Sequence, residues 1–157
     1  MTPLSRDDAR AVADLSAGLI LASVEIAAPP ERVFTAISTA EVAEWWGSAE
    51  LYRVTKWTAD LRPGGKWRSD GVSADGRSFA VYGEILEVEP PRLLVQTWQY
   101  ADQNSPPTTL RYRIEPIPGG SRVTVRHDGF TDMASCESHA VGWERVLGWL
   151  TQWLTAH

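Results

Sequence analysis

The sequence predicts an α+β domain in which a curved antiparallel sheet wraps around a long C-terminal helix. Three observations lead to this prediction. Short extended segments separated by turn residues fill residues 53–127. An apolar stripe of helical period runs through the end of the chain. No helical pattern separates the extended segments, which excludes parallel crossovers because those need an intervening helix.

Length and composition fit one globular domain. The chain has 157 residues, of which 43% are hydrophobic and 22% charged, and a chain of this size buries about two thirds of its unfolded surface. We place the domain at residues 19–157. Residues 1–18 are an N-terminal extension, in which Ser5 and the acidic residues after it indicate either a short helix to about Leu15 or a mobile tail.

Charge and cysteine content narrow the choice of partner and compartment. A net charge of -5 and the lack of any Lys/Arg run argue against a nucleic-acid partner. Cys136 is the single cysteine, so we expect neither a disulfide nor a metal site. The acidic N-terminal stretch differs from a secretory signal, and no apolar run reaches the roughly 18 residues that cross a bilayer. We therefore expect a cytoplasmic protein without a membrane span or cofactor.

The order of the elements follows from changes of pattern along the chain. Residues 19–27 are rich in apolar and β-branched types and end at a proline pair, which predicts the first strand. Pro30 then opens a short helix, and a second one is expected over residues 40–46. Gly83 predicts a bulge or bend that curls the sheet. Turn residues delimit six further strands, which makes seven in all: 53–61, 66–72, 77–88, 92–100, 108–115 and 121–127.

The long C-terminal helix is predicted over residues 134–156. At 1.5 Å per residue it is about 33 Å long, which is enough to cross a sheet. Each buried tryptophan removes about 200 Å² from water, so a stripe that contains tryptophans must face the sheet. Gly142 is expected to allow close approach beside Trp143. The stripe consists of Cys136, His139, Trp143, Val146, Leu147, Leu150, Trp153 and Leu154.

Six short motifs occur in one order over residues 19–155: APPERVFTAIS (28–38), EWWG (44–47), LRPGGKWR (61–68), GEILEVEPPRLLVQTW (83–98), HDGF (127–130) and HAVGW (139–143). In these motifs the chain resembles the activator of heat-shock-protein-ninety ATPase-like family. That family lies in the SRPBCC superfamily, with the START lipid-transfer domains, the birch-pollen-allergen fold and polyketide cyclases. The resemblance implies a START-like helix-grip fold with seven strands, and a cavity between sheet and C-terminal helix.

We expect that cavity to bind an apolar or aromatic small molecule. Trp45 and Trp46 either form a lid over its opening, or Trp46 packs in the core while Trp45 covers the sheet edge. His139 is either a structural histidine or a group that bonds a ligand or acts as a base. The expected ligand contacts are Trp46, Trp57, Trp67, Trp98, His139, Trp143 and Leu147.

Some polar residues on the strands are candidates for the cavity wall, and the sequence leaves two further functions open. One or two polar strand residues should point inward and orient a polar ligand group. A cyclase- or hydrolase-type enzyme would use the same cavity and need a polar pair with perturbed pKa values. A chaperone-related interaction module, suggested by family analogy, would need an exposed apolar patch, and a homodimer is a further alternative. The polar candidates are Glu25, Arg68, Glu84, Gln96, Arg111 and Arg113.

Overall fold

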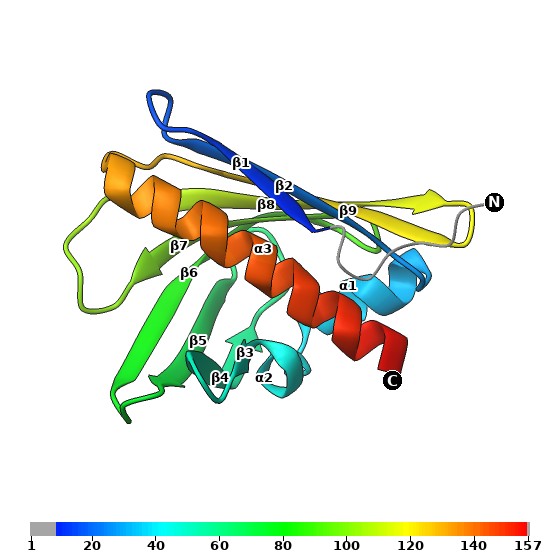
Figure 1. Ribbon diagram of the computed structural model, residues 1–157, viewed down its shortest axis with the longest axis horizontal. Coiled ribbons are helices and arrows are strands. Elements are labelled where there is room, and N and C mark those ends of the chain that lie inside the picture. Colours follow the sequence, from blue (N-terminus) through cyan, green and yellow to red (C-terminus); the bar gives the residue numbers. More distant parts are fainter. Residues whose placement is uncertain (1–8, 157) are drawn as a thin grey trace.

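The computed structural model describes residues 9–156 and contains one antiparallel sheet with a long helix across its inner face (Figure 1). The elements are β1 (Arg10–Asp14), β2 (Leu19–Ile26), α1 (Pro30–Ser38), α2 (Val42–Trp45), β3 (Gly47–Ser48), β4 (Tyr52–Ala59), β5 (Lys66–Ser73), β6 (Ser78–Glu89), β7 (Leu93–Tyr100), β8 (Thr108–Ile117), β9 (Gly120–Asp128) and α3 (Met133–Ala156). The α+β class and the long C-terminal helix are thus confirmed.

The sheet is open and has nine strands rather than the expected seven. Its order is β1-β2-β9-β8-β7-β6-β5-β4-β3, so the two additional strands lie at the two edges. The seven expected strands are present, and their ends differ from the prediction by one or two residues. The count was wrong because β1 and β3 are only five and two residues long, too short for a periodic pattern to stand out.

The helix expected over residues 5–15 is wrong where the structure describes it, since residues 10–14 form strand β1. Its expected start at Ser5 lies outside the described residues. The side chain of Asp14 accepts hydrogen bonds from the Ser16 hydroxyl at 2.8 Å and the Ala17 N–H at 3.1 Å. Such a local bond favours a turn over a helix. The turn ends at Gly18, whose φ of 63° suits glycine, and the chain returns as β2.

The sheet bends so that β4 and β5 turn away from the layer formed by β1, β2, β8 and β9 (Figure 1). At Gly83 the Trp67 indole crosses the strand and donates to the Thr97 carbonyl at 2.8 Å. A Cβ at Gly83 would overlap that carbonyl, so glycine is required for this close approach. The register shift itself lies further along β6, between Ile85 and Glu87. Gly83 therefore marks a close approach, and the bulge comes three residues later, at Leu86.

Helix α3 buries one side against the sheet and is held near its middle and near its C-terminus. Near its C-terminus the Trp153 indole donates to the Glu41 carboxylate at 2.6 Å, and Arg32 pairs with the same carboxylate at 2.7 Å. Near the middle of the helix, Glu144 accepts a bond from the Ala11 N–H of β1 at 2.9 Å. The fully or nearly buried helix residues are Cys136, Ala140, Trp143, Val146, Leu147, Leu150, Thr151 and Leu154.

The close approach expected at Gly142 is not found. A Cβ added at Gly142 would meet no atom within 4 Å, and the same holds for Gly148. Within residues 9–156, no helix is both long enough and apolar enough to cross a membrane.

Candidate ligand cavity

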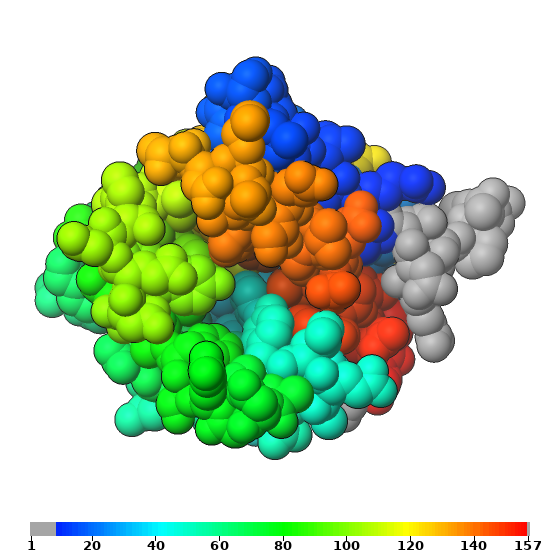
Figure 2. All heavy atoms as spheres, turned by 60° about the vertical axis from the view of Figure 1, so that its left-hand side comes forward, coloured from blue at the N-terminus to red at the C-terminus, as the bar shows by residue number. Residues whose placement is uncertain are grey.

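A cavity of about 380 Å³ lies between the inner face of the sheet and α3. This volume falls within the range of pockets that hold small molecules. Figure 2 shows a hollow between the first half of α3, in orange, and the segments near residues 50 and 100. Its lining is Ile37, Val42, Trp46, Leu51, Tyr52, Val54, Trp57, Trp67, Ser69, Ser73, Phe79, Val81, Gln96, Trp98, Tyr100, Leu110, Tyr112, His127, Ser138, His139, Gly142, Trp143, Arg145 and Val146.

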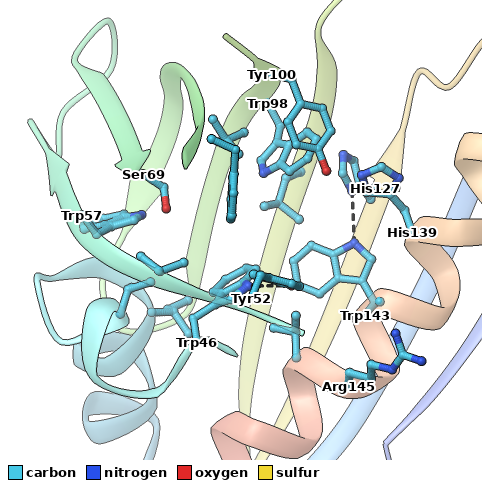
Figure 3. Close-up of a pocket in the computed structure, with 18 of the residues that line it drawn as sticks. Trp46, Tyr52, Trp57, Ser69, Trp98, Tyr100, His127, His139, Trp143 and Arg145 are labelled. Atoms are coloured by element: carbon cyan, nitrogen blue, oxygen red, sulfur yellow. Dashed lines mark hydrogen bonds between the residues drawn. The ribbon is translucent and has the colours of Figure 1, made fainter. Parts of the chain in front are cut away.

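Aromatic rings form a large part of the wall, and several of them meet edge to face. Trp143 on α3 packs against Trp46 with ring centroids 5.8 Å apart and against Tyr112 at 5.9 Å. On β7, the rings of Trp98 and Tyr100 lie 4.7 Å apart. Figure 3 shows these rings arranged around one space, with Trp46, Tyr52 and Trp143 on one side and Trp98 and Tyr100 on another. Edge-to-face contact is a preferred arrangement of aromatic pairs, and here such pairs border the cavity.

The structure brings six of the seven expected contact residues to this cavity. Trp46, Trp57, Trp67, Trp98, His139 and Trp143 all line it. Leu147 does not line it: the residue is fully buried in the core. The two neighbouring tryptophans divide their roles, because Trp45 is buried and donates to the Ala36 carbonyl at 2.9 Å. Trp46 instead reaches the cavity and donates to the Tyr52 hydroxyl at 3.2 Å.

His127 connects three elements at the back of the cavity. The Trp143 indole N–H can only donate, so His127 Nδ1, 3.0 Å away, must be the acceptor. The ring proton therefore sits on Nε2 and is donated to the Thr108 hydroxyl at 2.7 Å. That hydroxyl donates in turn to the Trp98 carbonyl at 3.0 Å. His127 thus fixes α3, β8 and β7 relative to one another.

Burial keeps His127 uncharged. Its side chain is 0% exposed, and this burial, with a smaller effect from His139, lowers the pKa of the imidazole to about 3. The neutral ring is also the form that the Trp143 bond requires. His127 is therefore a neutral structural group at neutral pH.

His139 lies half-buried among other rings. Its centroid is 5.1 Å from that of Trp98 and 5.1 Å from that of Phe130. Nδ1 donates to the Ser135 carbonyl at 2.8 Å, because a carbonyl can only accept. Burial lowers the pKa of His139, and the Ser135 bond partly offsets this. The unprotonated Nε2 therefore offers an acceptor at the cavity wall.

Of the six polar strand residues named from the sequence, Gln96 is the one that points into the cavity. The alternation of polar and apolar residues did not distinguish it from the other five. Gln96 is 3% exposed and lines the cavity. Among buried side-chain atoms of the described residues, its Oε1 is the one without a hydrogen-bond partner. Four of the other candidates face the surface in ion pairs, namely Glu25 with Arg122, Arg68 with Asp70, Glu84 with Lys66 and Arg111 with Glu87. Arg113 is exposed.

The only permanently charged side chain among the lining residues lies at the rim of the cavity. Arg145 is the one lining residue with a permanent charge, and it is exposed. Burial raises the pKa of Tyr52, and the bond from Trp46 and the Arg145 charge partly offset this. Within residues 9–156 no group of three His, Cys, Asp or Glu side chains could hold a metal ion. The arrangement is suited to binding an apolar body with a few directed hydrogen bonds.

Comparison with known proteins gives the family. The model of the family described as Activator of Hsp90 ATPase homolog 1-like protein matches residues 27–155. The chain belongs to this family. The match spans α1 to α3 and so includes every residue of the cavity lining. No curated protein matches the chain.

Solved structures share the fold of this family member. A protein from Mycobacterium smegmatis, Ms6760, superposes with a TM-score of 0.77 at 23% identity over 99% of both chains. The AHSA1 protein from Silicibacter pomeroyi has a TM-score of 0.77 at 26% identity, over 88% of this chain and 98% of its own. CalU16 from Micromonospora echinospora has a TM-score of 0.70 at 22% identity, over 94% and 85%. At such identities the likeness concerns the fold.

Proposed function

We propose that the protein binds an apolar or aromatic small molecule between the sheet and α3. The observation that carries this proposal is an unfilled cavity of about 380 Å³ in a chain with eight tryptophans. Protein interiors rarely contain voids larger than a water molecule. Tryptophan side chains that served packing alone would therefore fill this space. Five of the tryptophans instead border the space.

The wall favours flat aromatic ligands. Rings that already meet edge to face present both ring faces and ring edges to the cavity, and a ligand ring can add to this arrangement. Burial of the ligand's apolar surface supplies most of the binding free energy. The hydrogen bonds of His127 already hold the Trp143 and Thr108 side chains in place. These side chains therefore lose little conformational entropy when a ligand binds, which also favours binding.

Two glycines of α3 provide a test with a matched control. Gly142 lines the cavity and has open space where a side chain would go, whereas Gly148 has equal room but does not line it. Gly142→Leu should fill the cavity and lower the affinity for 2-methylnaphthalene at least tenfold in calorimetric titration. Gly148→Leu should leave that affinity unchanged. Both exchanges replace a helical glycine, so each should raise the free energy of unfolding by up to about 1 kcal/mol.

The stability measurement separates loss of the cavity from loss of the fold. If Gly142→Leu is as stable as the wild type and still binds 2-methylnaphthalene with unchanged affinity, the ligand site is not this cavity. Failure of the wild type to bind any aromatic probe would contradict the proposed function as a whole.

A further inference from the structure

We infer that the ligand carries an uncharged hydrogen-bonding group, such as a hydroxyl or carbonyl, which pairs with the amide of Gln96. This inference rests on the proposed function and specifies the chemistry of its ligand. It starts from a buried polar group for which the folded chain supplies no partner.

The surroundings of Gln96 explain why its oxygen is unpaired. On the neighbouring strands, Gln96 lies opposite Ile85 of β6 and Leu110 of β8, which are 0% and 1% exposed. Along its own strand, the next residues on the same face are Leu94 and Trp98. Ile85, Leu110 and Leu94 carry no hydrogen-bonding group, and the Trp98 indole N–H makes no bond to the amide oxygen. The Gln96 side chain lines the cavity, so a bound ligand can lie next to its amide group.

An amide in this position costs free energy unless something bonds to it. Buried polar groups in folded proteins are nearly always hydrogen-bonded, and an unpaired one weakens the fold. Leucine would fit the apolar surroundings of position 96 better. A ligand group that bonds to the amide removes the cost, so the site favours a ligand with such a group over an equally large apolar molecule.

The inner lining indicates that this ligand group is uncharged. His127 and His139 both have lowered pKa values because they are buried, so neither offers a positive charge at neutral pH. Arg145, the charged lining residue, is exposed at the rim. A carboxylate or ammonium group placed at Gln96 would lose its hydration without gaining a counter-ion. A hydroxyl meets both needs of an amide, since it donates to the oxygen and accepts from the nitrogen.

Three naphthalene derivatives of similar size test this inference in calorimetric titrations at pH 7. The probes are 2-naphthol, 2-methylnaphthalene and 2-naphthoate, which carry a hydroxyl, a methyl and a carboxylate at the same carbon. Wild-type protein should bind 2-naphthol about tenfold more tightly than 2-methylnaphthalene, the gain from one added hydrogen bond. It should bind 2-naphthoate more weakly than 2-naphthol.

Variants at two glutamines of β7 assign the preference to one side chain. Gln96→Leu should bring the two affinities, for 2-naphthol and for 2-methylnaphthalene, to within about twofold of each other. Gln99→Leu makes the same exchange on the opposite face of the strand, where Gln99 donates to the Ser105 carbonyl at 3.1 Å, and should keep the tenfold preference. Gln96→Met removes the amide with a more flexible side chain and provides the same readout should the leucine variant unfold.

The outcomes distinguish this inference from the proposed function. Equal binding of 2-naphthol and 2-methylnaphthalene by the wild type overturns the inference and leaves the proposed function intact. A hydroxyl preference that survives both Gln96 exchanges also overturns it, as does tighter binding of 2-naphthoate than of 2-naphthol. Absence of binding by all three probes contradicts the proposed function itself.

Discussion

His127 shows how much a single residue determines the shape of the cavity wall. The ring receives a bond from α3 and gives one to β8, so the positions of Trp143 and Thr108 depend on one another. A charged imidazole could not accept the Trp143 bond, because both of its nitrogens would carry protons. The fold at this point therefore requires a neutral histidine.

This requirement makes stability depend on pH. An unfolded histidine titrates near pH 6.5, whereas in the folded state the pKa of His127 is lowered to about 3. The stabilisation by neutral His127 is complete above pH 6.5 and is lost as the pH falls toward 3. Over this range His127 is protonated in the unfolded chain but stays neutral in the folded one. Wild-type protein should lose about 2 kcal/mol more of its free energy of unfolding between pH 7.5 and pH 5 than His127→Gln does, in urea titrations at both pH values.

Glutamine retains an acceptor for the Trp143 indole and removes the titrating group. Equal losses of stability in the two proteins over this pH interval would show that His127 does not carry the effect.

Sequence reasoning at the residue scale found aromatic groups more readily than polar ones. Six of the seven expected residues line the cavity. Periodicity places the large rings of α3 and of the strands on shared faces, and Trp46 lies between α2 and β3. Gln96 was one of six polar candidates of equal standing. Its neighbours on β6 and β8 decide its orientation, and their register depends on the bulge near Leu86, which no local pattern reveals. His127 needed the same three-dimensional information.

Among the elements, α3 was the most predictable and β1 the least. An apolar stripe that repeats from Cys136 to Leu154 is a strong helical signal. Strand β1 has five residues, and its side chains alternate between exposed and half-buried. It pairs with β2, which follows it in a hairpin, and it contacts α3, which is far away in sequence. Tertiary contacts therefore outweigh the weak helical propensity of the segment.

The attachment of β1 to α3 leads to a prediction for this element. Glu144 accepts the Ala11 N–H at 2.9 Å, on the edge of β1 that faces away from β2. Glu144→Ala should speed hydrogen exchange of the Ala11 amide by about tenfold, while amides of β8 and β9 exchange as before. Glu137→Ala removes a carboxylate from an exposed position of the same helix and should change neither. Unaltered exchange at Ala11 in the Glu144 variant would mean that this bond does not hold the edge strand.

On the scale of the whole molecule, the cavity results from a bent sheet that a straight helix cannot fill. Figure 1 shows α3 crossing the inside of the bend, with β4 and β5 turned away from it. Their tryptophans, Trp57 and Trp67, both line the cavity, and Figure 3 shows Trp57 on the side opposite α3. Sequence periodicity predicted the sheet, the helix and their contact. It could not predict an unfilled volume, because the same apolar residues can close a core or border a pocket.

The tryptophans themselves provide the most direct test of ligand binding in this cavity. In a two-dimensional ¹H–¹⁵N spectrum each indole N–H gives its own signal. Addition of 2-naphthol should shift the indole signals of the tryptophans that line the cavity, Trp46, Trp57, Trp67, Trp98 and Trp143. It should leave those of Trp45, Trp149 and Trp153 in place. Shifts confined to the latter three, or no shifts at saturating 2-naphthol, would contradict the account.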